Sequence, residues 1–248
     1  MDPNNIRMRE FIYSLIDIKP NITILDLGCG QGYDLFRISE LLDDGSRLVG
    51  IDSMENSIIK AKKNYGQDVR INFINHNFAQ DIPFNDDSFD LVISNNMLEC
   101  IKDKQHLLRE VHRVLKPEGQ VIFAHFDWDS QLIDGDNKAL IRTITQTFND
   151  WKQDWMDDID SWMGRRLWRT FQDSRLFTGK IETHVLTNTK FEEPYYGHMM
   201  IRDFESLVRR DMLKAEDYKG FLDNVEILNK SDQFFYSITM YIYVGAKS

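Results

Sequence analysis

The sequence predicts an α/β fold: a Rossmann-like, seven-stranded, mainly parallel sheet with helices on both faces and helical lid insertions in the C-terminal half. Two observations lead to this prediction. Short runs rich in β-branched residues alternate with amphipathic stretches through the first half of the chain, which is the pattern of strand–helix–strand crossover units. A glycine-rich turn follows the first of these runs, at the position where open parallel sheets bind their ligands.

Each expected strand corresponds to one apolar, β-branched run. The runs that predict the first five strands are 22–27, 47–52, 69–75, 89–94 and 120–126, and two later runs of alternating polarity are 180–189 and 234–245. The clearest helix is expected at about 104–116, where leucine and valine recur every three or four residues. A Lys-Pro-Glu-Gly turn at 116–119 ends this helical pattern.

The 248 residues are expected to form a single domain, because no linker rich in Pro, Gly or Ser divides them. We expect residues 1–20 to form an N-terminal helix and residues 21–128 to form a compact core. Residues 130–175 read mostly as helix, and inserts at 129–162 and 191–230 would cover one edge of the sheet as a lid. The tryptophans of this half suit either lid packing or a substrate cage, and two of them, Trp151 and Trp155, would share a helix face.

The composition limits the possible partners and location. The chain has 30 Lys and Arg against 40 Asp and Glu, and the net charge of −10 opposes broad attraction to nucleic acid or anionic lipid. No apolar run approaches the roughly 20 residues of a membrane-spanning helix, and the start lacks the layout of a secretion signal. The two cysteines, Cys29 and Cys100, are too few for a disulfide framework. We expect a cytoplasmic monomer or homodimer that acts on a small molecule, with no nucleic-acid or membrane partner.

The most informative motif is LDLGCGQGY at 25–33, where glycines stand at positions 28, 30 and 32. Glycine lets the backbone turn sharply and approach a ligand, and the following helix offers free N–H groups. The second strand ends 24 residues after Gly28 at Asp52, whose carboxylate can accept both hydroxyls of a ribose. These features predict an adenosine-containing cofactor. The spacing is not the G-x-G-x-x-G of dinucleotide binding, because Tyr33 occupies the third glycine position.

At these residues the chain resembles the class I S-adenosylmethionine-dependent methyltransferases. LDLGCGQG at 25–32 is similar to the first motif of that family, and GIDSME at 50–55 is similar to the second. DIPFNDDSFDLVISNNMLECI at 81–101 and LLREVHRVLKPEGQVIF at 107–123 resemble the ubiquinone/menaquinone-biosynthesis-type branch (methyltransferase type 11), which acts on small molecules. The resemblance covers about residues 20–126. It implies S-adenosyl-L-methionine as cofactor and S-adenosyl-L-homocysteine as product, and it does not identify the methyl acceptor.

The resemblance also implies a cofactor site, residue by residue. The implied cofactor-binding residues are Asp26, Gly28, Cys29, Gly30, Asp52, Ser53, Met54, Asn77, Phe78 and Asn95. Asp52 would take the ribose hydroxyls, and Met54 would pack on the adenine. Asn77 stands near the family's adenine-contacting acid, and its carbonyl can still accept from the adenine amino group. The alternative is purely structural: turn glycines, with Asp52 as the N-cap of the next helix.

The acceptor should bind beyond the carboxyl ends of the fourth and fifth strands, where the sequence reads His125-Phe126-Asp127-Trp128-Asp129. On a strand, residues 125, 127 and 129 share a face. These side chains would bind or deprotonate an acceptor, ligate a divalent metal, or cap the following helix. We favour the first alternative, with His125 and Asp127 as catalytic candidates and no metal. The remaining candidates for substrate binding are Tyr33, Glu99, Trp128, Asp129, Tyr195 and Tyr196.

The expected activity is therefore methyl transfer from S-adenosylmethionine to a small molecule. An amine nitrogen is the favoured acceptor, because acids and aromatic rings around the pocket attract an amine. Two alternatives stay open: O- or C-methylation of a phenol- or quinol-like metabolite, and a non-catalytic S-adenosylmethionine-binding module. Arsenic methylation would require several acceptor thiols, and two cysteines do not suffice.

Overall fold

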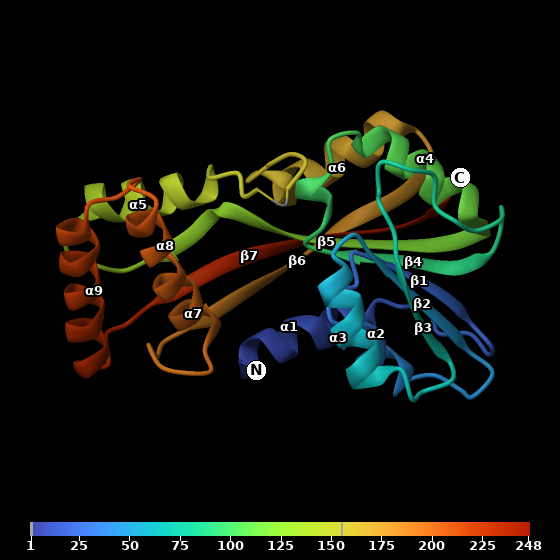
Figure 1. The fold of residues 1–248 in the computed structure, drawn as a ribbon, viewed down its shortest axis with the longest axis horizontal. Coiled ribbons are helices and arrows are strands. Elements are labelled where there is room, and N and C mark those ends of the chain that lie inside the picture. Colours follow the sequence, from blue (N-terminus) through green and yellow to red (C-terminus); the bar gives the residue numbers. More distant parts are fainter. Residues whose placement is uncertain (1, 155) are drawn as a thin grey trace.

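The computed structural model describes residues 2–154 and 156–248 and contains one seven-stranded sheet with the order β3-β2-β1-β4-β5-β7-β6 (Figure 1). The strands are β1 (Thr23–Leu27), β2 (Arg47–Asp52), β3 (Ile71–Asn75), β4 (Phe89–Asn95), β5 (Leu115–Ile133), β6 (Phe177–Asn188) and β7 (Tyr236–Lys247). The first five strands are parallel, whereas β7 is antiparallel to both of its neighbours. The predicted α/β fold with a mainly parallel sheet is confirmed.

Helices cover both faces of the sheet. The helices on one face are α1 (Pro3–Ser14), α2 (Tyr33–Ser39) and α3 (Glu55–Tyr65), and those on the other are α4 (Lys104–Val114) and α6 (Met163–Ser174). Successive strand residues alternate between these two layers: on β5, Ile122 and Ala124 join the core under α1–α3, and Val121 and Phe123 join the core under α4 and α6. The α4 helix begins at its N-cap Asp103, whose carboxylate accepts from the His106 N–H at 2.8 Å.

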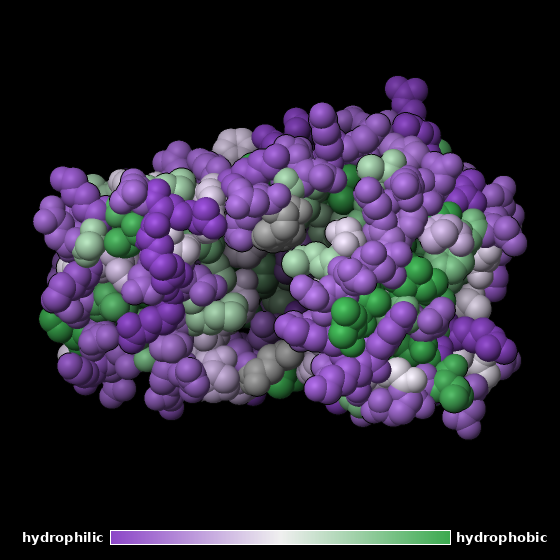
Figure 2. Space-filling view, viewed as in Figure 1, coloured by the Kyte–Doolittle hydropathy of each residue, from purple (hydrophilic) through white to green (hydrophobic). Residues whose placement is uncertain are grey.

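A second group of helices lies at the far end of the long strands β5, β6 and β7 (Figure 1). It consists of α5 (Lys138–Asn149), α7 (Tyr196–Asp203), α8 (Glu205–Arg209) and α9 (Ala215–Lys230). Because β5 is parallel to β4 and continues past it to Ile133, this group overhangs the carboxyl ends of the parallel strands. Figure 2 shows that the surface is hollowed between this helical group and the sheet with its covering helices. None of the helices in the part of the chain that the structure describes has the length and apolar character to cross a membrane.

The expectation of continuous helix over 130–175 is wrong at two places. The ladder between β5 and β7 continues to Ile133, which pairs with Tyr236, so the strand extends where helix was expected. In the described part of 150–162, the chain joins α5 to α6 without regular secondary structure. The pairing of Trp155 with Trp151 on one helix face falls outside the described residues.

Candidate active site

The glycine-rich turn takes a backbone conformation that favours glycine. Gly28, Gly30 and Gly32 have φ angles of 75°, 53° and 84°, in the left-handed region. The Gly28 N–H donates to the Ile51 carbonyl oxygen at 2.8 Å, which ties the turn to β2. A Cβ on Gly28 would lie 2.6 Å from Met97 Cγ, whereas a Cβ on Gly30 would meet nothing within 4 Å. The turn is therefore packed from behind at Gly28 and open at Gly30, as a cradle for a ligand requires.

Asp52 is held at the tip of β2 by two backbone amides. Its Oδ2 accepts from the Gly30 N–H at 2.9 Å, and its Oδ1 accepts from the Met54 N–H at 2.8 Å. The following helix α3 has Met54 at its N-cap and no side-chain cap, so Asp52 does not cap this helix. Each carboxylate oxygen can accept a further hydrogen bond, and the oriented group therefore suits two ribose hydroxyls.

These elements surround a cavity of about 220 Å³. Its lining residues are Gly28, Gly30, Asp52, Ser53, Met54, Ser57, Asn77, Phe78, Asn96, Met97, Cys100, Ile101 and Asp157. Most of the expected cofactor residues thus lie around one space, which we call the cofactor cavity. Their contact with a cofactor stays a prediction. The combination of an acidic group, apolar walls and the open edge at Gly30 fits an adenosine moiety. Sequence reasoning missed Asn96, Met97 and Asp157, although Asn96 follows β4 directly and has a φ of 55°.

Three expected cofactor residues do not line this cavity. Cys29 is buried, and its Sγ would lie 2.7 Å from a Cβ on Gly50, so the side chain packs toward the sheet. Asp26 is 3% exposed, and burial together with the neighbouring carboxylates of Asp34 and Asp52 raises its pKa well above the usual range. The side-chain oxygen Oδ1 of Asn95 is buried and has no hydrogen-bond partner among the described residues. An acid and an unpartnered acceptor beside the turn fit a ligand that carries an ammonium group.

The N-terminal helix α1 adds a cation to this region. Arg9 forms an ion pair with Asp34, and the Tyr13 hydroxyl also donates to Asp34. The Asn95 side-chain amide reaches the same carboxylate at 3.5 Å. The Arg9 guanidinium also lies 5.6 Å from the ring centre of Tyr33, the first residue of α2. The structure therefore places Tyr33, expected to bind substrate, beside Arg9 at the turn.

A second cavity, of about 270 Å³, lies next to the first. Its lining residues are Glu99, Trp128, Phe148, Asn149, Trp151, Gln153, Met156, Ile159, Met200 and Asp203. Neighbouring residues of the chain line the two cavities: the short 3-10 helix η1 (Leu98–Cys100) gives Glu99 to one and Cys100 to the other, and the segment after α5 gives Met156 to one and Asp157 to the other. A hydrogen bond of 3.2 Å from the Asp158 N–H to the Cys100 carbonyl oxygen joins these two walls. We call this second space the acceptor pocket.

Glu99 is one of two acidic groups among the described lining residues of the acceptor pocket, with Asp203. It is 5% exposed, and its Oε2 accepts from Trp128 Nε1 at 2.5 Å. The same oxygen lies 3.8 Å from His125 Nε2. Burial raises the pKa of Glu99, and the nearby His125 opposes part of this increase. Of the residues expected to act on the acceptor, Glu99, His125 and Trp128 are therefore brought together.

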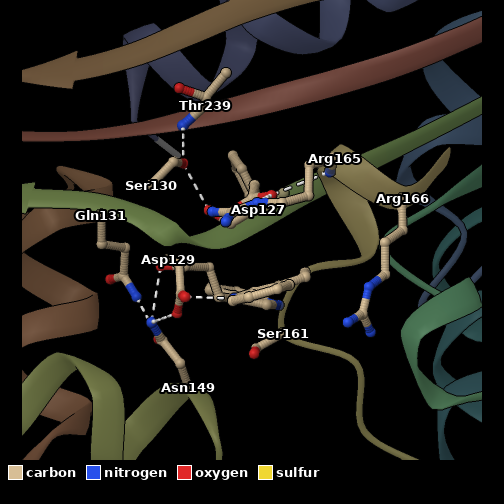
Figure 3. A network of polar contacts seen from close by, with 12 residues as sticks. Asp127, Asp129, Ser130, Gln131, Asn149, Ser161, Arg165, Arg166 and Thr239 are labelled. Atoms are coloured by element: carbon tan, nitrogen blue, oxygen red, sulfur yellow. Dashed lines mark hydrogen bonds and ion pairs between the residues drawn. The ribbon is translucent and has the colours of Figure 1, made fainter. Parts of the chain in front are cut away.

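Asp127 has a different environment from His125. It is 1% exposed and accepts from both Nε and Nη2 of Arg165 at 2.5 Å, and from the Arg165 backbone N–H at 3.0 Å (Figure 3). Both carboxylate oxygens are thus engaged by the start of α6. This arrangement fits a structural ion pair and does not fit the catalytic role expected for Asp127. The side chains of residues 125, 127 and 129 have separate partners, and within 2–154 and 156–248 no three His, Cys, Asp or Glu side chains are grouped to hold a metal ion.

Asp129 lies where β5 bulges away from β7. Asp127 pairs with Thr239 and Leu132 pairs with Ser237, so residues 128–131 stand opposite the single residue between them. The Thr239 N–H donates to Ser130 Oγ at 2.8 Å, which closes the bulge (Figure 3). Asp129 accepts from Trp162 Nε1 and, at 3.3 Å, from Asn149 Nδ2. The bulge interrupts the alternation of the strand, and Asp129 holds the chain on both sides of 150–162.

The two tyrosines expected in a lid loop lie near the acceptor pocket but do not line it. Tyr196 is 9% exposed and its ring centre lies 5.4 Å from that of Phe126, so it belongs to the core under α7. Tyr195 lines a separate cavity of about 560 Å³ on the outer side of α7. Asp203 lines both this outer cavity and the acceptor pocket. Sequence reasoning missed Asp203 and Met200, because a helical period alone did not show which side of α7 faces the sheet.

Comparisons with known proteins agree with the geometry. A family model described as a methyltransferase domain matches residues 18–190. An uncharacterized 37.1 kDa protein in transposon TN4556 of Streptomyces fradiae is 25% identical over 240 residues, which are 96% of this chain and 66% of that protein. A demethylmenaquinone methyltransferase of Bacillus cereus is 34% identical over 116 residues, 46% of this chain and 48% of that protein. This chain therefore spans about two thirds of the first relative and about half of the second.

Solved structures show the same fold. The crystal structure of the YcgJ protein from Bacillus subtilis has a TM-score of 0.61 at 14% identity and covers 97% of this chain and 98% of that chain. Phosphoethanolamine N-methyltransferase 2 of Haemonchus contortus, in complex with S-adenosyl-L-methionine, has a TM-score of 0.58 at 15% identity and covers 97% of this chain and 52% of that chain. Because the family model spans more than half of the sequence and the fold and cofactor cavity agree with it, this chain belongs to the class I S-adenosylmethionine-dependent methyltransferases.

Proposed function

We propose that this protein transfers the methyl group of S-adenosylmethionine to the nitrogen of a small-molecule amine. One observation carries the proposal: the acceptor pocket, which adjoins the cofactor cavity, places two carboxylates among aromatic rings. The carboxylates are Glu99 and Asp203, and the rings belong to Trp128, Phe148 and Trp151. Among the described lining residues there is no lysine or arginine.

This lining selects for charge. A cationic or hydrogen-bonding amine is attracted by carboxylates and by the faces of aromatic rings. An acceptor with a carboxylate or phosphate would place like charges together at short range in a site shielded from water. Burial raises the pKa of Glu99, which makes it a better proton acceptor than an exposed acid, and partial desolvation raises the pKa of Asp203.

The residues of the first cavity would hold the cofactor. Asp52 would bind the ribose hydroxyls, and Met54 and Phe78 would pack on the adenine. Asp26, which is buried behind the turn and does not line the cavity, would attract the ammonium group. When bound there, S-adenosylmethionine supplies a methyl group on a positively charged sulfur. The chain's own contribution is to align the acceptor nitrogen with that methyl group and to exclude water. Alignment alone can contribute on the order of 7–11 kcal/mol, so no elaborate catalytic machinery is required.

We also propose that the chain divides as the sequence suggests, with a cofactor core at 21–128 and lid segments at 129–162 and 191–230. In support, the core gives the acceptor pocket only Glu99 and Trp128 among the described lining residues, and the others come from the two lid segments. The net charge of −10 supports a small-molecule substrate over nucleic acid or a membrane. A cytoplasmic monomer or homodimer stays part of the proposal.

The proposal is tested with a panel of acceptors. Purified protein and S-adenosylmethionine are incubated with primary and secondary amines, phenols, quinols and carboxylated amines, and S-adenosylhomocysteine and methylated product are measured by mass spectrometry. We expect product from uncharged-tail amines and little from carboxylated ones. If only phenols or quinols give product, the acceptor atom is an oxygen or a carbon and the proposed amine acceptor is wrong. Cofactor binding without product from any acceptor would favour a non-catalytic binding module.

A matched pair of variants links the activity to the pocket. Glu99→Gln removes the carboxylate from the pocket wall, and we expect the KM for the amine to rise at least tenfold. Glu118→Gln makes the same change at an exposed glutamate near the opposite end of β5, and should leave the KM unchanged. Equal KM values in the two variants would show that Glu99 does not bind the acceptor.

A further inference from the structure

We propose that Glu99 and His125 form a proton-sharing pair that takes up the proton lost by the methyl acceptor. Glu99 would contact the acceptor, and His125, which lies behind it, would act as a positioning residue that completes the pair. This inference rests on the proposed function, because it assigns the path of the proton in the same pocket. It is carried by the hydrogen-bonding state of two buried side chains.

The tautomer of His125 follows from its contacts. The side chain is 1% exposed, and Nδ1 lies 2.8 Å from the carbonyl oxygen of Phe126. A carbonyl oxygen can only accept, so Nδ1 carries a hydrogen and donates it. In the neutral ring Nε2 is then an acceptor. It is buried and has no hydrogen-bond partner in the described part of the chain.

This bare nitrogen faces a carboxylate. Nε2 lies 3.8 Å from Glu99 Oε2, and both side chains are shielded from water. Two acceptor atoms that face each other in such a site lack a compensating hydrogen bond, which is costly. The separation of 3.8 Å exceeds that of a hydrogen bond, and one proton between the two atoms would draw them closer and satisfy both. The pair is therefore built to hold a single proton, either on the carboxylate or on the imidazole.

Within the described residues, the contacts of Glu99 leave Oε1 open to a ligand. Trp128 Nε1 also donates to Oε2, and among residues 2–154 and 156–248 no donor reaches Oε1. Glu99 lines the acceptor pocket, whereas His125 does not. The acceptor therefore meets Glu99 and not His125. The charged and titratable groups around the pair are Lys104 of α4, Asp160 of the segment before α6, Asp203 and Tyr196 of α7, Cys100 of η1, and Tyr241 of β7 opposite His125.

The proton step balances without another reactant. An N–H bond of the bound ammonium breaks and its electron pair stays on nitrogen, while an O–H bond forms on Glu99. An ammonium and a carboxylate thus become an amine and a carboxylic acid, and the proton is shared with His125 Nε2. The nitrogen is left with the lone pair that attacks carbon. Because the pair must be free of a proton to do this, kcat rises with pH as the pair loses its proton. Burial raises the pKa of Glu99, so the rise lies above the usual carboxyl range.

Two substitutions of His125 separate its two nitrogens. His125→Asn keeps an N–H near Nδ1 for the Phe126 carbonyl and removes the atom that faces Glu99. His125→Gln keeps a non-titrating N–H donor near Nε2. We expect kcat to fall about 10-fold or more in His125→Asn, with its pH rise displaced because Glu99 then holds the proton alone, and to recover in part in His125→Gln. Glu99→Gln should lose about 100-fold in kcat and the pH rise itself. Thermal unfolding and cofactor affinity check that each variant is folded.

A spectroscopic readout tests the pair without any acceptor. In protein labelled with ¹⁵N histidine, the His125 signals are identified by their loss in His125→Asn. We expect the tautomer with hydrogen on Nδ1, and an Nε2 shift that changes in Glu99→Gln but not in Glu118→Gln. If the Nε2 chemical shift is the same in Glu99→Gln as in the wild type, the proposed pair is overturned. If amines are methylated and the pH rise is the same in all variants, the pair fails while the proposed function stands. If no amine is methylated, the proposed function fails and the NMR result decides the pair.

Discussion

The cofactor cavity and the acceptor pocket adjoin each other but are built in different ways. Around the cofactor cavity, backbone geometry positions the main groups: left-handed glycines shape the turn, and the N–H groups of Gly30 and Met54 fix Asp52. Around the acceptor pocket, side chains from distant segments meet, such as Glu99, Trp128 and Met200. Short contiguous motifs can specify the first kind of site. The second kind depends on how the whole chain folds.

The carboxylates of the two regions also differ in their ionisation. Structural acids away from the cavities have a lowered pKa because cations pair with them, as Arg70 does with Asp68 and Arg113 does with Glu110. The acids of the acceptor pocket have a raised pKa because the protein shields them from water more than nearby cations, such as Arg209 near Asp203, compensate. The fold therefore stabilises the charged form of acids that hold the structure together, which we call anchoring acids. It leaves the charged form less stable where a ligand would bring the compensating charge.

The largest expected effect on stability tests whether Asp127 is an anchoring acid, one that holds the structure together through an ion pair. Arg165→Ala leaves the Asp127 carboxylate, 1% exposed, without its cation. We expect the free energy of unfolding to fall by about 2–3 kcal/mol, less than for a fully buried pair because the Arg165 side chain is 43% exposed. Chemical denaturation measures this loss, and cofactor affinity should not change.

The neighbouring arginine is the matched control. Arg166 pairs with Asp160 at 2.6 Å, and its side chain is 37% exposed. Arg166→Ala should cost less than about 1 kcal/mol. If Arg165→Ala kept full stability and abolished turnover, the catalytic role that the sequence predicted for Asp127 would return, and the contrast between anchoring and functional acids would fail on β5.

The second effect concerns the backbone-held acid of the cofactor cavity. Asp52→Ala removes the group that would accept the ribose hydroxyls, and cofactor binding should weaken by about 1.5–3 kcal/mol, or about 10- to 150-fold. Calorimetry with S-adenosylhomocysteine measures the change. Glu55→Ala, an exposed acid in the first turn of α3, is the control and should bind as the wild type does. Unchanged affinity in Asp52→Ala would contradict the ribose role.

The sequence predicted the sheet and the position of the glycine-rich turn well because their signals are local. The run at 47–52 matches β2 at both ends, and the glycines at 28 and 30 line the cavity as expected. The course of β5 was only partly predictable. Its strand continues through the bulge at 128–131, where the alternation of polar and apolar residues breaks, because polar bonds and pairing with β7 hold it.

The acceptor pocket was the least predictable part. Alternation along a strand correctly places His125 and Asp127 on one face. It does not show that Arg165 of α6 pairs with Asp127, or that Glu99 of η1 lies beside His125. Arg165 is 38 residues from Asp127, and Glu99 is 26 residues from His125 along the chain. A single sequence offers no signal for such pairings, since charge and period fix the face of a residue and not its partner.

A smaller effect is expected where the two regions are joined. Asp129 accepts from Trp162 and Asn149, and so fastens both ends of the segment 150–162 that walls both cavities. Asp129→Asn replaces charged hydrogen bonds by neutral ones, at about 1 kcal/mol. We expect the acceptor KM to rise several-fold with a smaller change in kcat. The exposed Asp134→Asn is the control, and a KM equal to it would show that the segment holds its place without Asp129.

The smallest effect is a difference in sign between two glutamates as pH changes. The folded pKa of Glu110 is lowered, first by its hydrogen bond from Arg113, so it adds stability above the usual glutamate pKa and loses it as pH falls through the lowered value. The folded pKa of Glu99 is raised by burial, so the protein loses stability from Glu99 as pH rises from the usual value through the raised one. Relative to wild type, Glu110→Gln should therefore become less stable with rising pH, by less than about 1 kcal/mol, and Glu99→Gln more stable. Urea unfolding between pH 4 and pH 8 measures both differences. Curves of the same sign would mean that the acid in the acceptor pocket is stabilised like an anchor, and the distinction between the two regions would then rest on backbone geometry alone.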